Sequence, residues 1–184
     1  MAVKDLYEKA CEAANKGNYD YAIELFREVL RLEPQYPGAR VLLRGTERRR
    51  VSEQGTFVST ILGIVKGLWP LIKANLQFKN FRKKLEYCED YLEYNPDSAG
   101  VLLMAAQAAR KADLKEAGVS ILKDILAFKP EHKQALRALG QALEEDGKTR
   151  EALKFLSKLS VLTPTDRELE SRVKNMEAQA HMQD

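Results

Sequence analysis

Few side chains in this 184-residue sequence could carry chemistry. The two histidines, His132 and His181, lie at ligand spacing from no cysteine, second histidine or paired acid, which disfavours a metal site. No GxGxxG stretch and no glycine-rich loop ending in GK[ST] is present to bind phosphate. The acids Glu144 and Glu145 are typical of a solvated helix surface. We therefore expect no catalytic residue, no metal and no cofactor, and a role other than that of an enzyme.

Composition indicates a globular protein, with 45% hydrophobic and 31% charged residues. Two cysteines, Cys11 and Cys88, are too few for a disulfide framework and favour a reducing compartment. Residues 1–17 are charged and contain no apolar stretch, so they do not resemble a secretory signal. We expect a cytoplasmic protein, with attachment to the periphery of a membrane left open.

Four prolines share one register and indicate a repeat. The phrases RLEP, EYNP, AFKP and VLTP end at Pro34, Pro96, Pro130 and Pro164, at intervals of 62, 34 and 34 residues. Two intervals match a helix–turn–helix period of about 34 residues, and the first is 28 residues longer. Proline cannot continue a helix, so each one marks the turn into the next unit.

Small residues recur where paired helices must cross. Twelve residues before the prolines stand Ala22, Gly118 and Ala152, with Lys84 as the exception. Early in three units the small residues are Ala10, Ala106 and Gly140. Gly17 and Gly147 are placed to end the first helices of their units.

On these residues the sequence resembles the tetratricopeptide repeat family. The resemblance implies an all-α fold, a right-handed solenoid of helix–turn–helix repeats in one domain spanning residues 1–184. The expected repeats are 3–36, 37–98, 99–132 and 133–166, with a polar-backed capping helix over 167–181.

The second repeat must hold the 28 extra residues, which we place at 51–78, between helices at 37–50 and 79–94. Residues 56–73 segregate on a helix into an apolar and a polar arc, which predicts an amphipathic helix. Pro70 is expected to kink or end it, leaving 71–76 as a separate turn. The apolar arc includes Phe57, Ile61, Ile64, Leu68, Trp69 and Ile72.

Several interpretations of this apolar face remain open. It covers the solenoid's own groove as a lid, associates with a second copy of the chain, or lies in a membrane interface. A spanning helix is disfavoured, because a span needs about 20 apolar residues and this segment contains a lysine and a proline.

Positive charge concentrates around the insertion. Residues 40–84 hold eleven Lys and Arg against two acids, while the rest of the chain holds 19 basic and 25 acidic residues. These cations either pair with neighbouring acids or meet anionic headgroups or phosphates. Nucleic-acid binding is disfavoured, since aromatic residues do not interleave with the cations. The predicted basic flank comprises Arg48, Arg49, Arg50, Lys83 and Lys84.

The resemblance also implies where a partner binds. In this family the first helices line a concave groove that holds a peptide or protein segment. By register, the groove residues here are Lys4, Tyr7, Cys11, Asn15, Leu103, Gln107, Arg110, Gln134, Arg137 and Gln141. Members that clamp the acidic tail of heat-shock chaperones carry a Lys and an Asn one turn apart, where this chain has Tyr7 and Cys11. We expect a scaffold for a peptide or protein partner, without that clamp.

Overall fold

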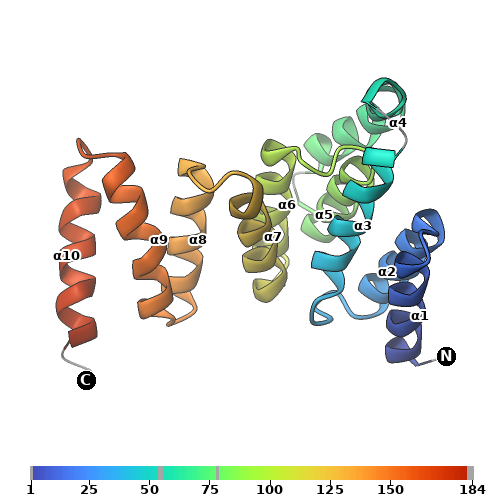
Figure 1. Cartoon of the computed structure of the whole chain (residues 1–184). Helices are drawn as coiled ribbons and strands as arrows, with labels where there is room; N and C mark the ends of the chain where they lie inside the picture. The colour runs from blue at the N-terminus through green and yellow to red at the C-terminus, as the bar shows by residue number, and fades with distance from the viewer. Residues whose placement is uncertain (1, 54–55, 78, 182–184) are drawn as a thin grey trace. The chain divides into compact units, whose positions relative to one another are not determined.

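The computed structural model describes residues 2–53, 56–77 and 79–181, and the side chains of 56–65 and 179–181 lie outside this description. Ten α-helices account for most of the described residues (Figure 1). They are α1 (Val3–Asn15), α2 (Tyr19–Leu32), α3 (Ala39–Glu53), α4 (Thr56–Leu76), α5 (Phe81–Leu92), α6 (Ala99–Lys111), α7 (Lys115–Phe128), α8 (Lys133–Glu145), α9 (Thr149–Leu162) and α10 (Arg167–His181).

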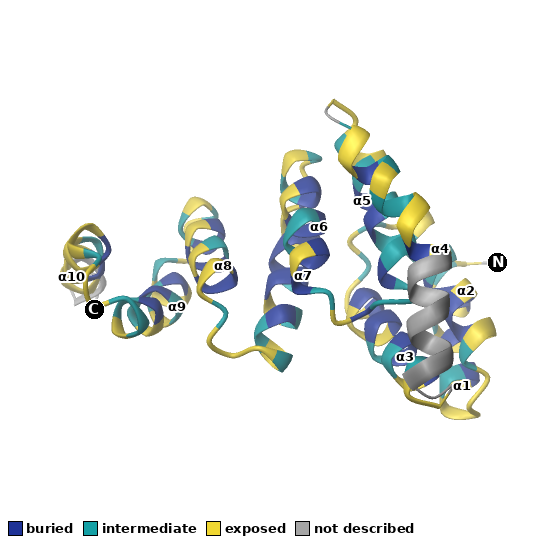
Figure 2. Cartoon of the chain, turned by 90° about the horizontal axis from the view of Figure 1, so that it is seen from above, coloured by how far each residue is buried: buried dark blue, intermediate teal, exposed yellow. Residues whose placement is uncertain are grey.

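The chain divides into two compact units, 1–121 and 122–184, with the boundary inside α7. In the first unit α1 packs on α2, α2 on α3, α4 on α5 and α5 on α6. In the second unit α8 packs on α9 and α9 on α10. Figure 2 shows the buried sides of these helices turned toward their packing partners.

The predicted repeat landmarks fall where the sequence placed them. Ala10, Ala22 and Ala152 are fully buried, consistent with close helix crossings. A Cβ atom added to Gly140 would lie 2.4 Å from Leu156 Cδ2, so this crossing leaves no space for a side chain. Gly17 and Gly147 have φ of 78° and 73°, a conformation that favours glycine at the end of a helix.

Within the insertion, residues 56–76 form one helix rather than a helix and a separate turn, and residues 51–53 belong to α3. Pro70 was expected to kink or end this helix and to leave 71–76 as a separate turn; it lies inside α4, which continues to Leu76, so the end and the separate turn were wrong. Proline removes one backbone hydrogen bond of the helix interior. Gly67 and Ala74, on either side of Pro70, are both buried, and this packing holds the helix together across the proline.

The partner of α5 also differs from the sequence interpretation, which paired residues 37–50 with 79–94 in one hairpin. In the structure α5 packs against α4. Ion pairs join Arg44 of α3 to Glu89, and Arg50 to Glu93, so the numbering rises together along both helices. Helices α3 and α5 therefore run parallel, whereas the two helices of a hairpin run antiparallel.

Candidate functional site

The predicted groove residues of α1 are divided between solvent and the core. Lys4 and Asn15 are exposed, whereas Tyr7 and Cys11 are half-buried against the core of α1 and α2. The Tyr7 ring lies 4.9 Å from that of Tyr36, measured between centroids. Burial, together with the neighbouring Cys11, raises the pKa of Tyr7. No cation stands at these two positions, so they do not form a carboxylate clamp.

The predicted positions of α6 are mixed in the same way. Gln107 is exposed, while Leu103 and Arg110 are half-buried. A Cβ atom on Gly118 would lie 2.5 Å from Arg110 Cγ, so the arginine stem lies across the crossing of α6 with the start of α7.

The predicted positions of α8 form a continuous exposed row. Gln134, Arg137 and Gln141 are all exposed, and their spacing of three and four residues places them on one helix face. Arg137 Nη2 donates to Asp166 Oδ2 at 2.7 Å, and Leu169 N donates to Asp166 Oδ1 at 3.1 Å, so Asp166 both caps α10 and orients Arg137. The hydrogen bond from Arg137 lowers the pKa of Asp166. One residue of the row, Arg137, is thus joined to the N-terminal cap of α10 by a charge-assisted contact.

A buried ionic cluster joins α2, α3 and α5, and no repeat pattern in the sequence predicted it. Arg44 and Glu47 are 2% and 1% exposed and pair with each other. Glu89 accepts from both Arg40 and Arg44. The sequence did contain a signal for this cluster, because Arg40 and Arg44 are four residues apart, as are Glu89 and Glu93.

Arg50 corrects the predicted basic flank. It is 7% exposed, and its Nη2 donates to the Glu93 carbonyl at 2.6 Å, so it is not available to a headgroup or phosphate. Arg48 Nε lies 2.6 Å from Asp97 Oδ1, while Arg49 and Lys83 are exposed and Lys84 is half-buried. Much of the positive charge of residues 40–50 is therefore neutralised by acids of α5 and the following turn.

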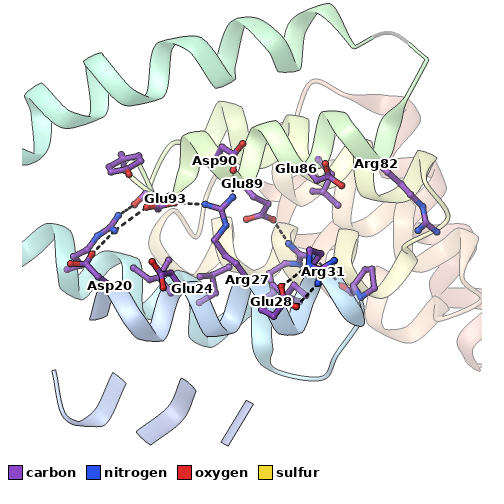
Figure 3. A pocket seen from close by; sticks show the side chains of 18 of the residues that line it. Asp20, Glu24, Arg27, Glu28, Arg31, Arg82, Glu86, Glu89, Asp90 and Glu93 are labelled. Carbon is purple, nitrogen blue, oxygen red and sulfur yellow. Dashed lines mark hydrogen bonds and ion pairs between the residues drawn. The ribbon is translucent and has the colours of Figure 1, made fainter. Parts of the chain in front are cut away.

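Two members of the cluster, Arg40 and Glu89, line a cleft of about 1010 Å³ between α2 and α5. Figure 3 shows Arg27 reaching from α2 across this cleft to Asp90 and Glu93. At the rim, Arg31 pairs with Glu28 on the same helix. The cleft is lined by charges that are largely paired with one another, an arrangement suited to fixing α2 against α5.

Most of the described apolar side chains of α4 are exposed, although Leu71 is half-buried. Leu68, Trp69, Ile72 and Leu76 are 57%, 63%, 42% and 64% exposed (yellow in Figure 2). The interpretation that this face covers the chain's own helices is therefore wrong for Leu68, Trp69 and Ile72. The side chains of Phe57, Ile61 and Ile64 lie outside the described residues.

The opposite side of α4 makes the contact with α5. A Cβ atom on Gly67 would lie 2.9 Å from Asn95 Nδ2 and 3.0 Å from Tyr91 Cδ2. A glycine at this position lets α4 approach Tyr91 and Asn95 without displacing their side chains, so the small side of the helix packs and the bulky side is left in solvent.

Among the residues that the structure describes, no three His, Cys, Asp or Glu side chains gather as metal ligands. In the same part of the chain, none of the helices combines the length and the apolar character needed to cross a bilayer.

Comparison with known proteins identifies the fold. No protein-family model and no curated protein matches the sequence. The first TPR domain of Spaghetti (RPAP3), solved with the HSP90 peptide SRMEEVD, matches with a TM-score of 0.55 and 18% identity over 63% of this chain and 94% of that chain. A structure of MamA matches with a TM-score of 0.51 and 15% identity over 94% of this chain and 84% of that chain. A second MamA structure has a TM-score of 0.50 and 16% identity over 90% and 94%.

The chain has the tetratricopeptide-repeat fold. This confirms the all-α fold class that the proline register predicted.

Proposed function

We propose that this protein is a non-catalytic interaction scaffold that binds a peptide or protein segment on the exposed face of its first helices. The observation that carries the proposal is the row Gln134, Arg137 and Gln141 on α8. Amide side chains both donate and accept hydrogen bonds, so they suit the backbone of an extended peptide. The guanidinium of Arg137 adds a site for a carboxylate. A partner with some acidic character fits this row.

The ion pairs around the row support its role, because they fix α8 and α10 in advance. Arg172 pairs with Glu144 near one end of the row, and Arg137 pairs with Asp166 at its centre. A surface held rigid before binding loses less conformational entropy when a partner docks. The RPAP3 domain, which shares the fold, is solved with an HSP90 peptide, and this also favours peptide binding.

The test is peptide selection followed by paired variants. Peptides are selected from a random display library on the full chain, and affinities are measured by fluorescence anisotropy. Replacing Gln134, Arg137 and Gln141 by alanine should weaken binding at least about tenfold, because a few residues carry most of the energy of such contacts. The matched control replaces the exposed lysines Lys154 and Lys158 of α9 and should leave affinity unchanged.

A second probe separates this surface from a chaperone clamp. The peptide SRMEEVD should bind no more tightly than a scrambled peptide of the same composition, because Tyr7 and Cys11 supply no cation for a specific clamp on its carboxylates. Selected peptides that bind both triple and control variants equally would place the binding surface elsewhere and refute the role of α8.

A second interface on α4 is an additional candidate function. The exposed row Leu68, Trp69, Ile72 and Leu76 favours it, because contiguous exposed apolar side chains mark interaction sites. Sedimentation and vesicle binding are measured for the full chain and for a variant with the row replaced. If the variant still self-associates and still binds vesicles as the wild type does, this candidate function is rejected.

A further inference from the structure

We propose that the exposed row of α4 docks on the surface of a membrane that contains anionic lipid. The inference deepens the second candidate function, an interface on α4, and does not depend on peptide binding at α8. It starts from the direction of the row. At about 100° per residue, Leu68, Trp69, Ile72 and Leu76 lie within one quarter to one third of the helix circumference. The buried Gly67 and Ala74 lie on the opposite side, so the row points away from α5.

Two lysines flank the row along one edge. Lys66 and Lys73 follow the same helical spacing beside Trp69. Lys73 Nζ lies 5.3 Å from the centroid of the Trp69 ring and 5.5 Å from that of Tyr87. Lys66 Nζ lies 5.1 Å from the centroid of the Tyr94 ring. The Trp69 ring holds the Lys73 ammonium group beside the apolar row, where long basic side chains reach the polar layer of a membrane, while Tyr94 holds that of Lys66 at the edge of the cleft between α2 and α5.

The charge of the helix selects an anionic partner. Residues 56–76 contain Lys66 and Lys73 and no Asp or Glu. Beyond the C-terminal end of α4, Lys79, Arg82 and Lys83 are exposed as well. Lysines near an anionic leaflet strengthen binding, and a tryptophan beside them suits the boundary between acyl chains and headgroups.

The same charges argue against a second copy of the chain as the occupant. A symmetric contact through α4 would bring Lys66 and Lys73 of both copies together, with no acid on either helix to pair with them. The described row also offers four large apolar residues, whereas a standard protein interface uses about 20–30 residues a side. An apolar row edged by lysine is the pattern of a helix that lies in the membrane interface.

The experiment uses the full chain with vesicles of phosphatidylcholine, and of phosphatidylcholine with phosphatidylserine. Trp69 is the single tryptophan, so its emission reports the row directly. We expect a blue shift and co-sedimentation with the anionic vesicles and weak binding to the neutral ones. Replacing Leu68 and Ile72 by serine should weaken co-sedimentation at least about tenfold. The control Val161→Ser, at an apolar residue 79% exposed on α9, should leave it unchanged.

The lysines allow a second, independent test of membrane binding. Replacing Lys66 and Lys73 by glutamine should weaken binding to anionic vesicles by about fivefold for each lysine. As the control, the same replacement of the exposed Lys133 and Lys148 should leave binding unchanged. Folding of every variant is checked by circular dichroism. The inference would be overturned if the folded wild-type chain does not bind anionic vesicles. It would also be overturned if neither the row variant nor the lysine variant binds them more weakly than the wild type. A dimer that dissociates in the Leu68 and Ile72 variant, without vesicle binding, would keep the interface on α4 and reject the membrane.

Discussion

Glu47 provides the sharpest test of the buried ionic cluster. Its side chain is 1% exposed, and Arg44, its ion-pair partner, is shared with Glu89. Burial raises the pKa of Glu47 from 4.5 to about 7. Burial also acts on Glu89, but Arg44 and Arg40 outweigh it and lower the pKa of that carboxyl. The cluster therefore holds one carboxyl that resists ionisation and one that is fully charged at neutral pH.

The sign of the pH effect follows from linkage. The folded chain binds the Glu47 proton more tightly than the unfolded chain does, so the contribution to stability is full below pH 4.5. It is lost as the pH rises through about 7. The difference between a pKa of 4.5 and one of about 7 corresponds to about 3 kcal/mol of unfolding free energy.

Glutamine has the shape of protonated glutamate and carries no charge. Glu47→Gln should therefore raise stability by only about 1 kcal/mol at pH 5 and by about 3 kcal/mol at pH 8. Glu89→Gln is the matched control within the same cluster. It leaves Arg40 and Arg44 without their shared carboxylate and should cost about 3–5 kcal/mol at pH 8.

Urea unfolding followed by far-ultraviolet circular dichroism at pH 5, 6, 7 and 8 measures both variants. The decisive quantity is the difference in unfolding free energy between variant and wild type, because the titration of other groups cancels in it. A loss of about 3 kcal/mol in Glu47→Gln at pH 8, parallel to that in Glu89→Gln, would show that Glu47 is ionised and would refute the reasoning.

Two further predictions concern packing and thiol access. Gly140→Ala should destabilise the second unit by about 1–3 kcal/mol, because the new Cβ would lie 2.4 Å from Leu156 Cδ2. Gly45→Ala, inside α3 with no atom within 4 Å of the added Cβ, should instead stabilise by about 0.5–1 kcal/mol, and chemical denaturation compares the two. Burial raises the pKa of the Cys88 thiol to about 12, so a thiol reagent at pH 8 should label the half-exposed Cys11 and leave Cys88 unlabelled until the chain unfolds. Rapid labelling of Cys88 in the native chain, seen by peptide mass spectrometry, would contradict its burial.

The local repeat pattern could be predicted because it depends on short-range geometry. The prolines mark the ends of α2, α5, α7 and α9, which stop two to four residues before them. Gly17 and Gly147 end α1 and α8 because their backbone conformation needs glycine. The exposed positions of α8 follow from the same register, since Gln134, Arg137 and Gln141 are set by helical spacing alone.

Which acid each arginine pairs with, and whether the arginine is buried, could not be predicted from this local pattern. Arg48 and Arg50 belong to one run of arginines, yet Arg50 is buried against Glu93 while Arg48 contacts Asp97 nearer the surface. The acids that decide this lie more than forty residues along the chain, on α5 and the turn after it. Helical spacing along one segment does not say which distant helix will approach it.

The sequence by itself determined that the chain folds as helical repeats, where most helices begin and end, and that residues 56–73 have one apolar and one small, polar side. Only the tertiary structure decided which side of α4 is buried. An apolar face predicts burial through the free energy of removing it from water, but packing also requires a surface of matching shape. Gly67 lets α4 approach Tyr91 and Asn95 closely, and this contact leaves Leu68 and Trp69 facing solvent.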